Sequence, residues 1–473
     1  MIKQELCNTS AKLNYSIDYQ IPRLNKTALS TDSLSMGTTI LNVWTFRDLR
    51  RILSGRHLAL YLTFLSTPCA GESTNKRMII PGARAQAVSG AFTAVANDAS
   101  AGWHNPAGLG FLKGPGVSAS VNNYSVSKKT VQGVASNVEL GENSSSIYPG
   151  FAGVNTTLGP LSVGWSYFTM DEQNTDESQS IQIDSPAALQ AEVPLPLAAA
   201  GFRYDRIQLT SGNLIHAGAS LALPIGKNIS LGISEFYYRR QKQTNLKERS
   251  TFTSGVFYDS FSRVSTKNEG TIAIAGALVR SGAFSMGVSV RIPRALSDKT
   301  DYETSQVIYT GTAPELASQS ISTHREDELT TRTWNLGIAW TPTDHATVSA
   351  DVVHYPATKT LWAGSGGFDT RATTDWSFGA ELRSDSLVVA GGAFTNSSLV
   401  RKPIPSLVWS DPSQINFVGF SIGVGLKTRQ SENLFIMTRQ QGRGYTQMVQ
   451  GDLTLQDVTI ETQTFSLSSS YKF

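Results

Sequence analysis

The most constraining feature of this sequence is an alternation of residue type that recurs along most of the chain. In segments 334–340 and 418–426, Trp, Leu, Ile, Val or Phe occupies every second position, and Gly, Ser, Ala or Asn stands between them. Because successive side chains of a strand point to opposite faces, each segment predicts a β-strand with one bulky apolar face. A soluble sandwich carries more Lys, Glu and Thr on its polar face, whereas a lipid-facing wall around a filled lumen requires this pattern.

Fourteen segments share this alternation, beginning near residues 117, 147, 160, 214, 228, 268, 283, 331, 346, 373, 386, 415, 433 and 459. Short turns such as Leu158-Gly159 and Ser384-Asp385 join alternate pairs. Long polar stretches, which we expect to be loops, join the others at 127–145, 170–212, 241–266, 293–330, 356–372, 396–413 and 440–457. Short turns on one side, long loops on the other and an even strand count are typical of outer-membrane barrels. The predicted fold is therefore all-β, a transmembrane antiparallel β-barrel of about 14 strands.

The composition supports a membrane wall built of strands. Charged residues make up 16% of the 473 residues, below the ~25% typical of soluble domains. After residue 70, no run approaches the ~20 apolar residues of a spanning helix, and lipid tolerates only helices or closed sheets. Residues 71–473 hold 32 basic and 33 acidic residues without a basic stripe, so we expect no nucleic-acid partner.

The two ends of the chain carry export signals. Four arginines between 47 and 56 precede the apolar run 58–65 and then small residues, which is the pattern of a secretory signal peptide; the alternative is a buried helix. Residues 1–70 are long for such a leader, so Met36 is a candidate start. Pro68 disfavours lipoprotein processing at Cys69. The alternating last strand ends at Phe473, similar to the C-terminal signal that the barrel-assembly machinery recognises.

Residues 78–113 lack the alternation. They are rich in alanine and interrupted by glycine, which predicts short helices packed closely against other backbone. Pro106 disfavours the α conformation at Asn105, and Gly102 and Gly108 permit sharp turns.

The same residues carry a family resemblance. Gly-Ala-Arg-Ala at 82–85, Ser89-Gly90, Asp98-Ala99-Ser100 and above all Asn105-Pro106-Ala107-Gly108-Leu109 resemble the N-terminal hatch of FadL/TodX-type hydrophobic-compound transporters. PorV-like barrels and related spirochaete and Bacteroidetes families share this hatch pattern. The resemblance implies a fourteen-stranded barrel with the hatch folded inside as a plug. It also implies that ligand passes from a groove among the outer loops to an inner pocket, and leaves when the hatch shifts, in the best-known members sideways through a gap in the wall.

From these observations we divide the chain into a leader (1–70), a hatch or plug (71–116) and a barrel in the bacterial outer membrane (117–473). Within the hatch, the residues expected to serve structure and gating are Ser89, Gly90, Asp98, Asn105, Pro106 and Ala107. His104 is expected to be a satisfied polar core residue.

Candidate ligand-binding residues lie in three places. An amphipathic ligand needs apolar lining and a cation for its carboxylate. Residues 185–193 predict a loop helix with Pro186 at its first position, and Leu189 and Val193 would collect ligand there unless the helix is a lid packed on other loops. Arg291 and Lys427 fall on the lumenal faces of their strands.

Each of these cations, and Arg84 in the hatch, either meets a ligand carboxylate, pairs with a lumenal acid, or anchors the plug. The acids that could serve as partners are Asp351, Asp375 and Glu381. The run 324–328 is expected to be a solvated loop, or else a site for cations or lipopolysaccharide.

Three functions remain open. The first is passive transport of long-chain fatty acids or other hydrophobic compounds, with outer-membrane lipid and lipopolysaccharide around the wall. The second is a PorV-like scaffold in protein secretion or surface attachment, and the third is a plugged structural barrel. The sequence contains no Gly-x-Ser-x-Gly, His-Glu-x-x-His or P-loop motif, so we expect no enzyme activity, cofactor or metal.

Overall fold

The computed structural model describes residues 75–112, 114–134, 138–148, 150–183, 202–252, 257–309, 314–324, 331–358, 370–404, 413–446 and 455–473. The expected leader and the predicted loop helix at 185–193 lie outside them. Within the described residues no helix is long and apolar enough to cross a membrane.

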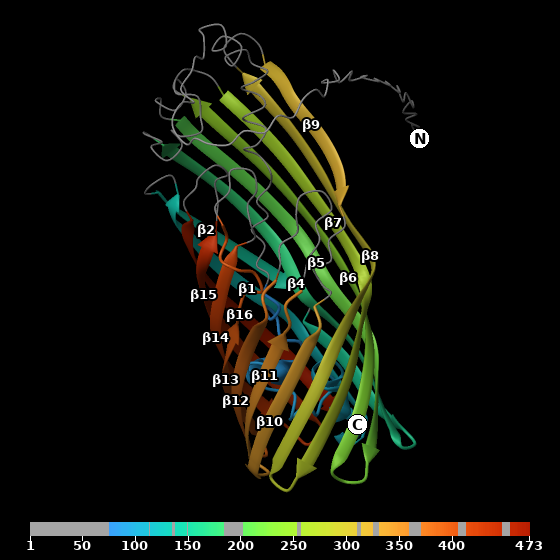
Figure 1. Ribbon diagram of the computed structural model, residues 1–473. Helices are drawn as coiled ribbons and strands as arrows, with labels where there is room; N and C mark the ends of the chain where they lie inside the picture. The colour runs from blue at the N-terminus through green and yellow to red at the C-terminus, as the bar shows by residue number, and fades with distance from the viewer. Residues whose placement is uncertain are drawn as a thin grey trace, which may run out of the picture. The chain divides into compact units, whose positions relative to one another are not determined.

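Sixteen strands form one antiparallel sheet (Figure 1): β1 (Gly116–Val134), β2 (Val138–Tyr148), β3 (Phe151–Leu158), β4 (Leu161–Ile183), β5 (Phe202–Ile225), β6 (Ile229–Phe252), β7 (Phe257–Ser281), β8 (Phe284–Tyr309), β9 (Pro314–His324), β10 (Thr333–Thr343), β11 (Ala346–Tyr355), β12 (Thr373–Arg383), β13 (Leu387–Asn396), β14 (Gln414–Lys427), β15 (Ser431–Thr446) and β16 (Gln456–Lys472).

The sheet closes on itself. The last strand, β16, pairs with β1 from Gly116–Lys472 to Gln132–Asp457, and β10 pairs with β8. Two wall positions are each occupied by two consecutive strands, since β2 and β3 both pair with β1, and β9 and β10 both pair with β8. The result is the closed fourteen-stranded antiparallel barrel that the alternation predicted.

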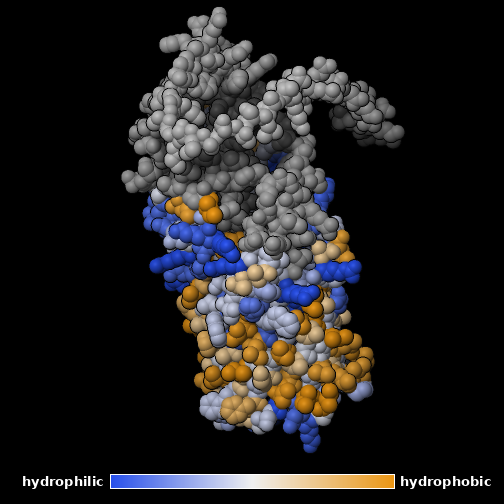
Figure 2. Space-filling model, in the orientation of Figure 1, coloured by the Kyte–Doolittle hydropathy of each residue, from blue (hydrophilic) through white to orange (hydrophobic). Residues whose placement is uncertain are grey.

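The two faces of the wall carry the residue types that the alternation predicted. Trp334 on β10 is 52% exposed and Val418 on β14 is 64% exposed, whereas their neighbours Asn335 and Gly419 are buried in the lumen. Bulky apolar side chains form an outer belt around the lower barrel (Figure 2), and polar residues lie above it. An apolar belt bounded by polar residues is the wall expected of a barrel in lipid.

The long polar stretches were wrongly predicted to be loops along much of their length. The polar stretch 241–266 is largely strand, because β6 and β7 stay in register from Ile229–Val279 to Thr251–Phe257. Strands β4 to β8 likewise continue far above the belt, whereas β10 to β13 end near its upper edge (Figure 1). Residues facing water on both sides carry no period-two hydrophobic signal, so the alternation ends before the ladder does.

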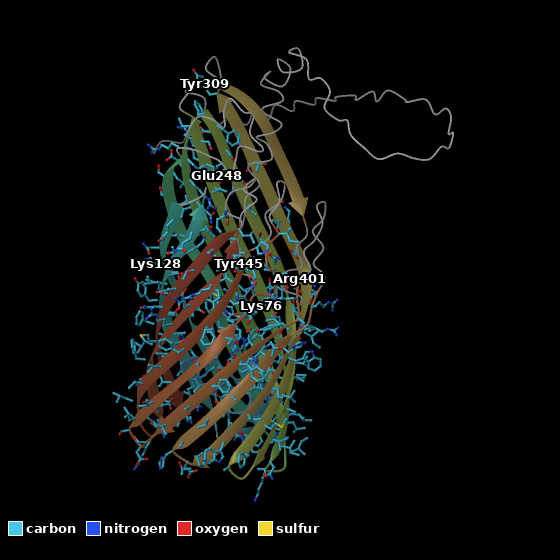
Figure 3. All side chains as sticks on the ribbon, turned by 60° about the vertical axis from the view of Figure 1, so that its left-hand side comes forward. Lys76, Lys128, Glu248, Tyr309, Arg401 and Tyr445 are labelled. Carbon is cyan, nitrogen blue, oxygen red and sulfur yellow. The ribbon has the colours of Figure 1, made fainter. Side chains whose placement is uncertain are left out.

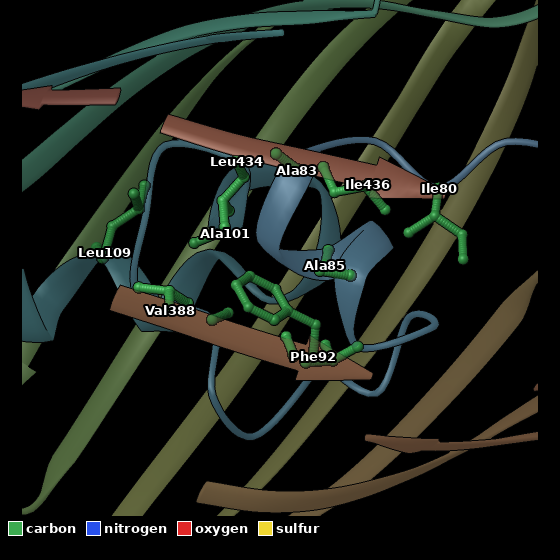
Figure 4. Close-up of a cluster of buried hydrophobic side chains, with 14 residues drawn as sticks. Ile80, Ala83, Ala85, Phe92, Ala101, Leu109, Val388, Leu434 and Ile436 are labelled. Carbon is green, nitrogen blue, oxygen red and sulfur yellow. The ribbon is translucent and has the colours of Figure 1, made fainter. Parts of the chain in front are cut away.

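The hatch lies inside the lower barrel (Figure 1) and contains α3 (Ala83–Ala87), α4 (Ala101–His104) and the 3-10 helix η2 (Pro106–Phe111). In Figure 4, α3 lies between β13, which contributes Val388, and β15, which contributes Leu434 and Ile436. Alanines such as Ala85 let the helix approach both strands and share one buried apolar cluster with them. The predicted plug of short helices is therefore observed.

Candidate functional site: the hatch and the wall around it

Asn105 locks the hatch to itself and to the wall. Its side chain is fully buried, and Nδ2 donates to the carbonyl of Thr93 at 2.9 Å and to that of Ala277 on β7 at 3.1 Å. Its Oδ1 accepts from the amide of Ala107 at 3.2 Å, and Pro106 follows as the first residue of η2. An amide side chain can donate and accept at once, so asparagine can make all three contacts.

Glycines of the wall let its backbone approach the hatch closely. A Cβ placed at Gly379 on β12 would lie 2.6 Å from the Cβ of Val88, and one at Gly232 on β6 would collide with the backbone of Pro106 and Ala107. Other glycines whose Cβ would meet the hatch are Gly153, Gly164, Gly276, Gly287, Gly337, Gly392 and Gly423. The small lumenal face that the sequence shows is thus the surface against which the plug packs.

Serine hydroxyls of the wall bind hatch carbonyls around the lumen. Four such bonds are Ser166 to Ala99 at 3.1 Å, Ser234 to Gly102 at 2.8 Å, Ser289 to His104 at 2.8 Å and Ser349 to Ala91 at 2.7 Å. These serines lie on β4, β6, β8 and β11, so the contacts are spread around the barrel. Each satisfies a buried backbone group that has no partner in a helix or ladder.

A chain of ion pairs joins α3 to the wall near the turn end of the barrel. Arg84 donates to Glu381 on β12 at 2.8 and 3.2 Å and to Asn97, and Arg383 binds both Glu381 and Glu432, the latter at 2.9 Å. Burial alone would lower the pKa of Arg84, but the Glu381 carboxylate outweighs it and the pKa rises above its usual value. Arg84 is therefore a firmly charged anchor.

A buried carboxylate binds the centre of the hatch. Asp351 on β11 accepts from the amides of Phe92 and Thr93 at 3.0 and 2.8 Å. Asp375 on β12 accepts from the amide of Ser397 at 2.9 Å, within the wall, and Arg77 donates to Ser377 on the same strand at 2.7 Å. The lumenal acids named from the sequence thus bind backbone amides or, in the case of Glu381, arginines.

Arg291 and His104 hold the segment around α4. The guanidinium of Arg291 donates to the carbonyl of Trp103 at 3.1 Å and stacks 4.6 Å above its ring. The ring of His104 donates from Nε2 to the carbonyl of Pro81 at 2.8 Å. Burial, together with the charge of Arg291, lowers the pKa of His104 to about 3, so this histidine is neutral in the closed hatch.

Trp103 also belongs to an aromatic cluster on the lumenal side of β3 to β7. Its ring contacts Phe168, His216 and Phe236 edge-on, with centroids 4.9 to 5.5 Å apart. The other members of the cluster are Ala99, Phe151, Leu214, Tyr238, Ile272 and Ile274, with Met170 at its margin. Two hatch side chains, those of Trp103 and Ala99, are therefore part of an apolar surface inside this side of the wall.

Three adjacent strands are irregular at the level of this cluster. The β1–β16 register shifts between Val121 and Tyr124, and the β4–β5 register shifts between Thr169 and Asp171. The β3–β4 ladder ends at Phe151 and Phe168, and above it β2 pairs with β1 among the described strands. The amide of Phe151 donates to the side chain of Ser120 at 2.6 Å. The wall is thus irregular beside its lumenal aromatic residues.

The remaining predicted residues fall into three groups. Ser89 has a positive φ of 56°, precedes Gly90 with φ of 80°, and donates to Ser421 at 3.2 Å. Asp98 accepts from the amide and hydroxyl of Ser100 at 2.8 and 2.6 Å, just before α4. Lys427 ends β14 near the turns, whereas Leu189 and Val193 lie outside the described residues.

The sequence analysis missed the roles of Trp103, Phe168 and Arg77. A signal existed for Phe168, since this bulky ring stands on the strand face opposite to Trp165. Trp103 lies in a segment without periodicity, and its partners come from strands far along the chain. Among the described residues, no group of three or more His, Cys, Asp or Glu could hold a metal ion.

Comparison with solved structures finds barrels of the predicted type. A Pseudomonas aeruginosa FadL homologue matches with a TM-score of 0.57 and 14% identity over 84% of this chain and 100% of that one. The P. putida toluene transporter TodX matches with a TM-score of 0.52 and 12% identity, over 82% of this chain and 98% of that one. The CymD monoaromatic hydrocarbon channel matches with a TM-score of 0.50 and 12% identity, over 84% of this chain and 98% of that one. No protein-family model and no curated protein matches the chain. The chain therefore has the FadL/TodX-type fold, as the hatch pattern predicted.

Proposed function

We propose that this protein is a bacterial outer-membrane barrel through which hydrophobic compounds, such as long-chain fatty acids, diffuse passively past the hatch. The observation that carries the proposal is the double role of Trp103. It belongs to the hatch, and it also packs within the aromatic cluster of the wall. Solved barrels of this fold are described as toluene transporters and monoaromatic hydrocarbon channels, which supports an apolar ligand.

Ligand binding and hatch movement would be coupled through this tryptophan. An apolar ligand that packs against Phe168 and Phe236 competes with Trp103 for the same surface. If Trp103 leaves the cluster together with its backbone, the bonds from Arg291 to its carbonyl must lengthen or break. Burial of the ligand's apolar surface, worth about 25 cal/mol per Å², would drive the exchange.

The route out of the cluster would run through the irregular wall beside it. Phe151 and Phe168 line the cluster and are also the last pair of the β3–β4 ladder. Above that pair, the amide of Thr169 still donates to the carbonyl of Gly150 at 3.3 Å. Separating the wall at this point would break few hydrogen bonds, so a lateral opening into lipid would cost little free energy here.

The ligand-binding roles of individual residues remain proposals. Arg84 and Arg291 are already bound to Glu381 and to the carbonyl of Trp103, so a ligand carboxylate would have to displace those partners. For Arg291 the displaced partner is the hatch itself, which suits a gating cation. Lys427, Leu189 and Val193 keep the roles expected from the sequence. Ser89, Gly90, Asp98 and the Asn105-Pro106-Ala107 segment are proposed to hold and release the hatch.

The surroundings follow from an outer-membrane location. The barrel-assembly machinery would recognise β16, which carries the C-terminal alternation and ends next to Phe473. Membrane lipid would contact the outer belt, and lipopolysaccharide would face the upper strands. We propose that the protein transports its ligand unchanged and has no enzymatic role.

The test is uptake of radiolabelled oleate and toluene by a strain that lacks its own transporter, with an empty vector as control. We expect uptake of at least one compound to rise, and we expect Trp103→Ala or a replaced Asn105-Pro106-Ala107 segment to alter it while the barrel still assembles. Uptake equal to that of the empty vector for both compounds would refute transport. A stoichiometric complex with a secretion component, without uptake, would establish the scaffold function instead.

A further inference from the structure

A group of cations stands on the outer face of β6, β7 and β8, directly above the apolar belt. Bulky apolar residues of the belt here include Tyr237, 41% exposed, and Ile292, 43% exposed, and Leu296 on β8, 58% exposed, lies beyond Arg294 among the cations. Two residues after Tyr237 and Ile292 along their strands, on the same face, come Arg239 and Arg294. Both side chains are exposed. Arg294 is level with Tyr237, because both pair with Thr271 on β7, and Arg239 stands one step higher, beside Glu269.

A row that contains two lysines lies just above Arg239. Lys267 on β7 stands directly opposite Lys299 on β8, and Gln241 on β6 completes the row. Side chains directly opposite each other in a sheet are about 5 Å apart at Cβ, and like charges in such positions destabilise the sheet. Two adjacent lysines on an outer face therefore indicate an anion that is present when the protein works.

The acids nearby neutralise only part of the group, and a third acid on this outer face, Glu235 on β6, lies two residues below Tyr237. Glu269 pairs with Arg239 at 3.4 Å, and Asp301 pairs with Lys299 at 2.9 Å. Within the described part of the chain, Lys267 and Arg294 have no ion-pair partner. An exposed cation is well solvated alone, but two unpaired cations beside two paired ones give this patch a local excess of positive charge.

The opposite side of the barrel is built differently. On β1, Lys128 (labelled in Figure 3) stands directly opposite Glu461 on β16, and Glu461 also pairs with Arg439 on β15 at 3.5 Å. There the charges above the belt alternate in sign. The cationic excess is thus a local property of β6 to β8 rather than a general property of the rim.

The position of the patch identifies the class of anion. It lies at the upper edge of the apolar belt, where hydrophilic residues replace hydrophobic ones (Figure 2), and on the side of the belt away from the short turns. In an outer-membrane orientation the short turns are periplasmic, so this edge meets the headgroups of the outer leaflet. Tyr237, with an apolar ring and a polar tip, is suited to the same boundary.

We propose that Arg239, Lys267, Arg294 and Lys299 form a binding site for the phosphate groups of an outer-leaflet glycolipid, namely lipid A. The inference rests on the outer-membrane location in the proposed function, but it requires no transport activity. The four cations span three neighbouring strands, wide enough for two phosphates on one headgroup. Arginine binds phosphate bidentately and lysine binds it as a point charge, so the patch supplies both modes.

The test is binding of diphosphoryl lipid A to the exported full-length protein in detergent micelles, counted by native mass spectrometry. We compare the wild type with Lys267→Gln/Arg294→Gln. The matched control, Lys247→Gln/Arg263→Gln, removes two exposed cations higher on β6 and β7. Retained folding is checked by the heat-dependent gel shift of each barrel. Each lost charged contact corresponds to about a tenfold loss of affinity, so the first variant should bind about a hundredfold more weakly.

The outcomes separate the possibilities. Weakened binding in the first variant, with near wild-type binding in the control, supports the site. Equal binding in all three proteins, or an equal loss in both variants, overturns it, since the second result reflects net charge alone. Inorganic pyrophosphate that binds as tightly as lipid A would overturn a lipid ligand. Oleate uptake is measured in parallel, and unchanged lipid A binding by a barrel without uptake would refute transport but not this site.

Discussion

Replacing Asn105 should open the hatch while leaving the barrel intact. The side chain is fully buried and joins two hatch segments and β7 through three hydrogen bonds. Asn105→Ala removes all three. Asn105→Asp keeps the shape but replaces the Nδ2 donor with an acceptor that faces the carbonyls of Thr93 and Ala277.

The magnitude follows from the groups left without partners. Each buried polar group that loses its hydrogen bond costs about 1–3 kcal/mol. The carbonyl of Thr93 and the amide of Ala107 lose the asparagine side chain in Asn105→Ala, which gives about 3 kcal/mol in favour of the open hatch. Since about 1.4 kcal/mol is a factor of ten, the open population should rise about a hundredfold. The aspartate variant should open further, because acceptors then face acceptors.

Cysteine labelling measures this population directly. Both native cysteines, Cys7 and Cys69, lie before the described residues, so a single new cysteine in the hatch reports alone once both are replaced. Ser100→Cys is nearly isosteric, and Ser100 is 1% exposed. In the regime where closing is faster than modification, the rate of thiol labelling is proportional to the open population.

We therefore expect labelling to accelerate about a hundredfold in Asn105→Ala and more in Asn105→Asp, with an unchanged heat-dependent gel shift of the barrel. Rates within threefold of the parent in both variants would refute the assignment of Asn105 as a lock. Loss of the folded barrel in either variant would refute the expectation that the barrel stays folded when the hatch opens.

Three further predictions use the same assay. Glu381→Ala leaves Arg84 buried without its carboxylate and should favour opening by about 3 kcal/mol, whereas a smaller effect than in Arg84→Met/Glu381→Met would contradict the ion-pair argument. The pKa of His104 is lowered to about 3 in the closed hatch. The neutral histidine therefore stabilises the closed hatch fully above about pH 6.5, and this stabilisation declines as the pH falls. At pH 5 the contribution of His104 should raise opening about thirtyfold, measured as the difference in pH dependence between the parent and His104→Gln. Gly379→Ala should open the hatch because its Cβ meets Val88, whereas Gly391→Ala, on the neighbouring strand, should not; equal labelling rates would argue against close packing.

The wall was largely predictable from the sequence because its two faces meet different solvents. Where lipid lies outside and the hatch inside, as along β14, bulky apolar residues alternate with small or polar ones. Where water lies outside, as on the upper half of β6, both faces are polar and the pattern vanishes although the ladder continues. The division of this part of the wall into β2 and β3 also left no signal, because it depends on pairing with β1.

The site was predictable in kind but not in its contacts. The hatch pattern identified Asn105 and Arg84, and the strand faces placed Arg291 in the lumen. Pairing Arg84 with Glu381, or Arg291 with Trp103, requires the relative height of two segments that are 297 and 188 residues apart. Such heights are set by the tilt and register of the whole barrel, which no local pattern records.

The serine hydroxyls that bind the hatch have a consequence for the way it moves. A hydroxyl turns about a single bond and can donate to whichever acceptor is near, including water. When the hatch shifts, Ser166, Ser234, Ser289 and Ser349 can therefore each exchange a carbonyl for water independently of the others. Displacement from the closed to the open hatch can then proceed through small, reversible steps, so that these four hydrogen bonds need not all break at once.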